Sequence, residues 1–231
     1  MLMLFRKDAE KEKEKAAKKE MQNAEKEMRN AEKEKQTAAA ALSEMCREAI
    51  RIYAKGEYQK AIETWTEAAS QGNAESMYWL GSITYHGQRV EKDIQKAMEW
   101  YEKAASGGYA GAYLKLAELY ERGKEVPQDL QKAFTLYKEA AELGDPEAQY
   151  NTAACYRKGT GTTQDHKKAA EWYQKAADQG DAQSMNDLGE CYAKGEGVPK
   201  DPKKAAALWK RAAKYGNSDA ANNLEDMMFG Y

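Results

Sequence analysis

The sequence predicts an all-α protein in which a right-handed α-solenoid of helix-turn-helix units follows one long charged helix. Three observations lead to this prediction. The chain repeats itself with a period of 36 residues, and a fixed period of this size is typical of a solenoid. Ala, Lys and Glu are abundant and only 4 of the 231 residues are Pro, a composition that favours helix. Residues 1–41 contain neither Gly nor Pro, so nothing in their sequence interrupts a helix.

Fixed polar positions predict two helices in each copy of the repeat. The four copies run over 74–109, 110–145, 146–181 and 182–217. In the first copy the first helix is expected over 74–86, and a glycine ends it because glycine adopts the left-handed conformation without a steric penalty. An aspartate then begins the second helix, because its side chain accepts hydrogen bonds from the free amides of the first turn. The glycines are Gly87, Gly123, Gly159 and Gly195, and the aspartates are Asp93, Asp129, Asp165 and Asp201.

Apolar positions that recur from copy to copy predict how the helices pack. Three copies have a leucine at one place on the first helix, and all four have an aromatic residue at one place on the second. Trp172 is expected to be buried between neighbouring units, and Cys155 and Cys191 are expected to be small core residues. The leucines are Leu80, Leu116 and Leu188, and the aromatic residues are Tyr101, Tyr137, Tyr173 and Trp209.

The loop between the two helices has a distinctive sequence in the last copy. Tyr192, Gly195, Gly197, Val198, Pro199 and Asp201 form the pattern Tyr-x-x-Gly-x-Gly-Val-Pro-x-Asp. On this pattern, residues 74–217 resemble Sel1-like repeats, which are related to tetratricopeptide repeats. Arg89 and Glu125 replace the second glycine in the first two copies, which leaves the shape of those loops open. The resemblance implies a scaffold or adaptor that binds another protein.

Both ends of the solenoid are expected to be atypical, as capping units usually are. Residues 42–73 make a shorter unit that resembles a tetratricopeptide repeat. Residues 218–231 supply one more helix, with Leu224 in the leucine position and a polar face through Asn222 and Asn223. The predicted organisation is therefore a charged helix over 1–41 and a solenoid over 42–231.

The first 41 residues carry a weak heptad pattern. They contain 11 Lys or Arg and 9 Asp or Glu, a net charge of +2, so the rest of the chain carries −4 of the total of −2. Met21, Met28 and Leu42 lie seven or fourteen residues apart, and the positions between them are Ala24, Ala31 and Ala38. This seam predicts weak self-association through residues 14–45, with a solvated charged helix as the alternative. If the seam pairs, the full chain should self-associate more than a fragment of 41–231.

Composition excludes several classes of partner. A net charge of −2 does not favour nucleic acid, and no apolar run approaches the roughly 20 residues of a membrane span. Residues 1–5 are apolar but too few for the core of a secretory signal. Three cysteines without Cys-x-x-Cys spacing predict a reducing compartment, the cytoplasm, with a secreted effector or a truncated membrane-anchored protein as open alternatives.

No catalytic or metal-binding pattern is present in the sequence. His86 and His166 have no second ligand at metal-binding spacing, and neither a Walker loop nor a nucleophile elbow occurs. We therefore expect no enzyme activity, no cofactor and no metal. The alternative is a β-lactam-binding or β-lactam-hydrolysing enzyme like the cysteine-rich Sel1-like proteins of Helicobacter, whose units carry paired cysteines that this chain lacks.

The remaining surface is the face of the first helices, which is expected to line a concave groove that holds a partner peptide or helix. Its residues vary from copy to copy, whereas the positions required by the fold repeat. Tyrosines should anchor the partner. Glutamates should select its basic groups and cations its acidic groups. The predicted contact residues are Tyr78, Tyr85, Leu114, Glu118, Arg122, Tyr150, Arg157, Lys158, Asn186 and Glu190.

Overall fold

The computed structural model describes the backbone of residues 2–229 and the side chains of residues 18, 20–227 and 229. Within these residues the chain forms eleven helices and no strand, as the all-α prediction requires. The helices belong to two compact units, one that ends at Asn73 and one that begins at Ala74. This division coincides with the start of the first full copy of the repeat.

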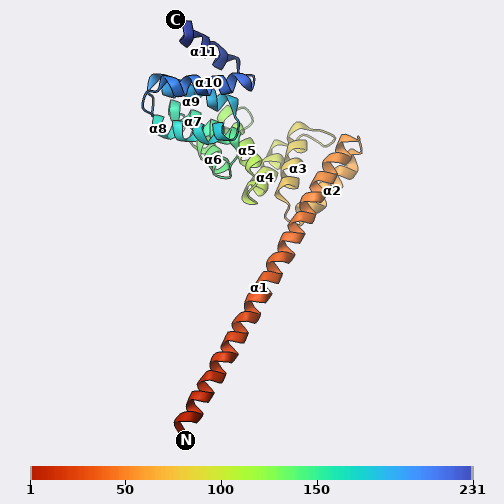
Figure 1. Ribbon diagram of the computed structural model, residues 1–231. Coiled ribbons are helices and arrows are strands. Elements are labelled where there is room, and N and C mark those ends of the chain that lie inside the picture. The colour runs from red at the N-terminus through yellow and green to blue at the C-terminus, as the bar shows by residue number, and fades with distance from the viewer. Residues whose placement is uncertain (1, 230–231) are drawn as a thin grey trace. The chain divides into compact units, whose positions relative to one another are not determined.

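The first unit is a helix pair with one very long member. Helix α1 spans Leu2–Ala54 and α2 spans Tyr58–Ser70. Figure 1 shows α2 beside the last part of α1, while the earlier part of α1 continues past it. Cys46, Ala49 and Ile52 are buried in this pair, together with Trp65 of α2. The expected boundary between residues 41 and 42 therefore falls inside a continuous helix, because no helix-breaking residue separates the charged segment from the short unit.

The second unit contains the four full repeats and a last helix (Figure 1). The first helices of the repeats are α3 (Ala74–His86), α5 (Ala110–Arg122), α7 (Pro146–Lys158) and α9 (Ala182–Lys194). The second helices are α4 (Ile94–Ser106), α6 (Leu130–Glu142), α8 (His166–Asp178) and α10 (Pro202–Lys214). Helix α11 (Ser218–Phe229) packs against α10. The predicted bounds of the first helix of copy one, 74–86, are confirmed.

The predicted start and stop residues have the expected geometry. All four aspartates at the starts of the second helices accept hydrogen bonds from backbone amides of the first turn. Asp145 and Asp181 do the same for α7 and α9, at 2.8 and 2.6 Å. Helix α5 differs, because Tyr109 precedes it and makes no side-chain cap. Local hydrogen bonding thus sets most of the helix bounds.

The predicted core positions are confirmed with one correction. The three leucines and the four aromatic residues of the second helices are at most 5% exposed. Trp172 packs between the cores of neighbouring repeats as predicted, but it is only half-buried. One face of its ring is covered by Lys175, whose Nζ lies 3.6 Å from the ring centroid. A long cation can cover an aromatic face while remaining in water, so this tryptophan stays at the rim of the core.

We expect Trp172→Ala to lower the free energy of unfolding by about 2–3 kcal/mol, less than the loss of a fully buried tryptophan. The substitution removes contacts to both neighbouring cores and the cation–π contact with Lys175. Urea unfolding followed by circular dichroism measures the change. An unchanged midpoint would contradict the packing of this side chain between repeats.

The second glycine of the loop joins one repeat to the preceding one. Gly161 and Gly197 have φ angles of 69° and 72°. A Cβ on Gly161 would overlap the carbonyl oxygen of Leu130, and one on Gly197 would overlap that of His166. Each loop therefore lies directly against the start of the second helix of the preceding repeat. In the first copy Arg89 takes the left-handed conformation with φ of 65°.

Candidate protein-binding face

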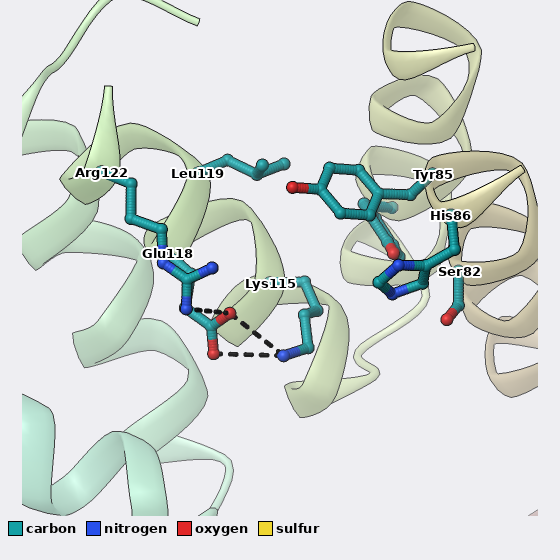
Figure 2. A pocket seen from close by; sticks show the side chains of 8 residues that line it. Ser82, Tyr85, His86, Lys115, Glu118, Leu119 and Arg122 are labelled. Atoms are coloured by element: carbon teal, nitrogen blue, oxygen red, sulfur yellow. Dashed lines mark hydrogen bonds and ion pairs between the residues drawn. The ribbon is translucent and has the colours of Figure 1, made fainter. Parts of the chain in front are cut away.

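A pocket of about 140 Å³ lies between α3, α4 and α5. Figure 2 shows its two walls, with Ser82, Tyr85 and His86 on one side and Lys115, Glu118, Leu119 and Arg122 on the other. Tyr101 of α4 completes the lining. The pocket thus joins an aromatic wall from one first helix to a charged wall from the next.

The charged wall is organised around Glu118. Lys115 Nζ lies 3.2 and 3.0 Å from its two carboxylate oxygens, and an Arg122 guanidinium nitrogen lies 3.7 Å away. The Glu118 side chain is 18% exposed, whereas those of Lys115 and Arg122 are 40% and 60% exposed. Ion pairs this exposed contribute little to stability. A carboxylate from another molecule can therefore compete for the two cations.

Tyr85 is the central residue of the aromatic wall. Its hydroxyl donates a 3.0 Å hydrogen bond to Glu125 in the loop after α5. Burial, followed by this hydrogen bond, raises the pKa of Tyr85. The His86 ring packs edge-on against Tyr85, with 5.0 Å between ring centroids. Tyr101 is buried, and this burial raises its pKa above the usual range. Both tyrosines are therefore neutral at neutral pH; Tyr85 gives the pocket a partly exposed aromatic side chain, and Tyr101 contributes a buried ring to its lining.

A second charged cluster links α7 to α9. Arg157 donates a 2.8 Å hydrogen bond to Glu190 and lies 3.9 Å from Asp187. Lys194 Nζ is 3.3 Å from the same Glu190 oxygen. Burial acts to raise the pKa of Glu190, but the hydrogen bond and charge of Arg157 bring it below its usual value. Burial raises the pKa of Asp187, against the charge of Arg157.

The predicted contact residues lie in several different environments. Tyr85, Glu118 and Arg122 line the pocket, and Lys158 is exposed at the end of α7. Arg157 and Glu190 form the ion pair between α7 and α9. Leu114 and Asn186 are 6% and 2% exposed, so the structure places these two inside the protein and not on the predicted groove. Tyr78 and Tyr150 are half-buried, with their rings against Tyr101 and Tyr173.

Asn186 is buried because it serves the contact with the C-terminal helix. Its side-chain oxygen accepts a 3.0 Å hydrogen bond from Asn223, and its backbone carbonyl accepts one of 3.1 Å from the Trp209 indole. Asn223 was expected on the polar face of the cap, whereas it donates into the neighbouring repeat. Leu224 is partly buried against the same core, as predicted.

Four Sel1 repeats match the chain, at residues 74–109, 110–145, 146–181 and 182–217. The chain belongs to the Sel1 repeat family. These matches cover more than half of its length and have the bounds of the four copies defined by the internal period. The Sel1 repeat is associated with protein interaction, so this assignment supports a scaffold with protein partners in general.

Two solved structures show the same Sel1 architecture. A Sel1 repeat protein from Oxalobacter formigenes is 31% identical, with a TM-score of 0.74, over 78% of this chain and 74% of that one. A protective antigen of uropathogenic Escherichia coli with an SLR fold is 34% identical over 72% of this chain, with a TM-score of 0.68. This chain spans 36% of that antigen. No curated protein matches the chain.

The cysteines of this Sel1 protein lie in its core. Cys46, Cys155 and Cys191 are buried and form no disulfide. Burial raises the pKa of both Cys155 and Cys191 to about 11, so they are scarcely ionised at neutral pH. Among the described residues there is no cluster of three metal ligands, and no helix is long and apolar enough to cross a membrane.

Lys115 and Tyr101 are pocket residues that were not among the predicted contacts. Lys115 lies three residues before Glu118 and seven before Arg122, so all three project from one face of α5. That spacing is visible in the sequence and was sufficient to find the lysine. Tyr101 is one of the four aromatic core residues that recur on the second helices, and only the three-dimensional structure shows that its ring also reaches the pocket.

Proposed function

We propose that this Sel1 repeat protein is a non-catalytic scaffold that binds an acidic segment of a partner protein on the face of its first helices. The pocket between α3 and α5 carries this proposal. It combines the partly exposed aromatic side chain of Tyr85 with two cations that are held only by weak ion pairs to Glu118. Aromatic and cationic side chains of this kind are common energetic centres of protein interfaces.

The balance of charge favours an acidic partner. Lys115 and Arg122 line the pocket with a single carboxylate, Glu118. Lys158 and Lys194 occupy the same place as Arg122 at the ends of the next two first helices, and both are exposed. A cation therefore recurs at this position in three of the four repeats, and the first repeat has His86 there.

Both glutamates that were expected to select basic groups already face cations of this chain. Glu118 contacts Lys115 and Arg122, and Glu190 contacts Arg157 and Lys194. A basic partner would have to displace these cations, whereas an acidic partner would add carboxylates to them. We therefore propose acidic selectivity in place of the banded selectivity expected from the sequence.

A matched pair of charge reversals tests the proposed face. Lys115→Glu/Arg122→Glu reverses the pocket cations, and Lys167→Glu/Lys210→Glu makes the same change in charge on the second helices α8 and α10. We expect the first variant to recover at least about 10-fold less partner than wild type in a pull-down quantified by mass spectrometry, and the second to match wild type. Both should melt near wild type, because all four side chains are at the surface.

The control also tests a rival surface. Lys167 lines a more open hollow of about 480 Å³ between α8 and α9, with Leu188, Tyr192 and Val198. If the Lys167→Glu/Lys210→Glu variant loses the partner and the pocket variant retains it, the second helices form the binding surface. That result would overturn the proposed site while leaving the scaffold fold unaffected.

A further inference from the structure

The early part of α1 is an exposed helix with a regular apolar seam. Residues 18 and 20–41 are all exposed, and the side chains of Met21 and Met28 are 65% and 63% exposed. Leu42, which continues the methionine row, is partly buried in the first unit. The unpartnered seam therefore extends from Met21 to Ala38, just before the helix joins the core of its own unit.

The spacing fixes the heptad register of this seam. The steps from methionine to alanine and back are three and four residues, which places Met21 and Met28 at position a and Ala24, Ala31 and Ala38 at position d. Lys35 occupies the next a position. A single polar residue at position a lowers stability but restricts the register and the number of helices that can pair.

Between residues 20 and 34, every residue that flanks the seam is negatively charged. Positions e and g in this stretch are occupied by Glu20, Glu25, Glu27, Glu32 and Glu34, and all five are exposed. The cations of this stretch lie at positions b and f, away from the seam, and they are Lys26, Arg29 and Lys33. The apolar seam thus has two acidic borders and a basic back.

This arrangement opposes pairing with a second copy of the chain. In a parallel pair, Glu20 and Glu27 at position g would face Glu25 and Glu32 at position e of the other copy. In an antiparallel pair, e faces e and g faces g, so glutamate again meets glutamate. Like charges at these positions destabilise a coiled coil, and a seam of Met and Ala buries too little area to compensate. Charge therefore argues against the self-association expected through residues 14–45.

We propose that residues 20–38 of α1 form a heterotypic coiled coil with an amphipathic helix of another protein that carries Lys or Arg beside its apolar seam. Such a partner converts each repulsive contact into an ion pair across the interface. This surface belongs to the first unit and the pocket to the second, so the two are separate. Taken with the proposed function, the chain then has two binding surfaces that prefer opposite charges. The pocket takes acidic groups, and α1 takes basic ones.

Two synthetic helical peptides test this preference against the full chain. Each has about four heptads with Ile at a and Leu at d, and they differ only at e and g, where one has Lys and the other Glu. Fluorescence anisotropy should show the Lys peptide binding at least about 10-fold more tightly than the Glu peptide, with binding that weakens at high salt. Equal binding of the two peptides, or no binding of either, would overturn the proposal.

Matched variants separate the seam from general charge attraction. Glu25→Lys/Glu27→Lys/Glu32→Lys/Glu34→Lys should reverse the peptide preference. Lys26→Glu/Arg29→Glu/Lys33→Glu should keep it, because these residues lie on the back. Met21→Ser/Met28→Ser should lose most binding to the Lys peptide while circular dichroism shows an unchanged helix content. Full binding by this last variant would show simple charge attraction and contradict a coiled coil.

Two further measurements complete the test. The Lys115→Glu/Arg122→Glu variant should bind the Lys peptide like wild type, so a failure of the pocket proposal does not affect this one. Sedimentation equilibrium of the wild-type chain should give a monomer at about 0.1 mM, the range in which weak association becomes visible. A wild-type dimer that Met21→Ser/Met28→Ser converts to a monomer would show that the seam pairs with itself and would contradict the charge argument.

Discussion

Gly197→Ala is expected to lower the free energy of unfolding by about 3–5 kcal/mol, the largest effect that we predict for a single methyl group. Two costs combine at this position. The residue has a φ of 72°, which a residue with a side chain adopts only with strain. In addition, the new methyl group would overlap the backbone carbonyl of His166 in the preceding repeat, and a backbone atom cannot move aside as a flexible side chain can.

The substitution Gly180→Ala measures the cost of the positive φ angle by itself. Gly180 has a φ of 98°, but a Cβ there meets no atom within 4 Å. It should therefore cost only about 1 kcal/mol. Chemical unfolding of the two variants under the same conditions measures the difference. Equal losses would mean that the loop does not rest on the preceding repeat as the structure indicates.

Arg157→Met is expected to lower the free energy of unfolding by about 2–4 kcal/mol. Methionine preserves much of the aliphatic side chain, but it removes the charge of Arg157 from the more buried Asp187 and leaves Glu190 with Lys194 alone. The side chains of Arg157, Glu190 and Asp187 are 22%, 26% and 11% exposed, so water screens the loss only in part. The substitution also removes the ion pairs that join α7 to α9, and it leaves two carboxylates three residues apart on α9 with one cation fewer beside them.

Arg122→Met is the matched control, an arginine on the preceding first helix. Its side chain is 60% exposed and its nearest carboxylate is 3.7 Å away, so its removal should change stability by at most about 0.5 kcal/mol. Thermal melts of the two variants decide between a structural and a surface role. If both melt like wild type, Arg157 does not stabilise the fold and is available to contact a partner, as predicted from the sequence.

Positions required in every repeat could be predicted from the sequence. The aspartates that begin the second helices recur, and so do the leucine and aromatic core positions. They recur because each repeat packs against its neighbours in the same way. Their local interactions, such as a cap bonding to the first turn, depend only on nearby residues. The helix bounds and most of the core follow from these patterns alone.

The candidate site was predicted less well because it depends on contacts between different repeats. Leu114 and Asn186 share one repeat position with Tyr78 and Tyr150, yet the first two are buried and the tyrosines are half-buried. Asn186 is covered because Trp209 and Asn223 bond to it. Such pairings join residues 23 to 37 positions apart and follow no period. Variation between copies therefore marks a position as free to change without showing that it is exposed.

The uninterrupted backbone of α1 fixes the direction in which its seam faces. Residues 18–41 extend about 36 Å along the helix axis at 1.5 Å per residue. Because each residue also turns the helix by about 100°, the azimuth of Met21 and Met28 is set by the number of residues that separate them from the buried Cys46 and Ala49. Inserting two residues near position 40 would rotate the seam to roughly the opposite side, whereas inserting seven would move it about 10 Å outward and nearly restore its direction. The length and twist of α1 therefore set both the distance and the direction at which a bound helix is held from the core of the first unit.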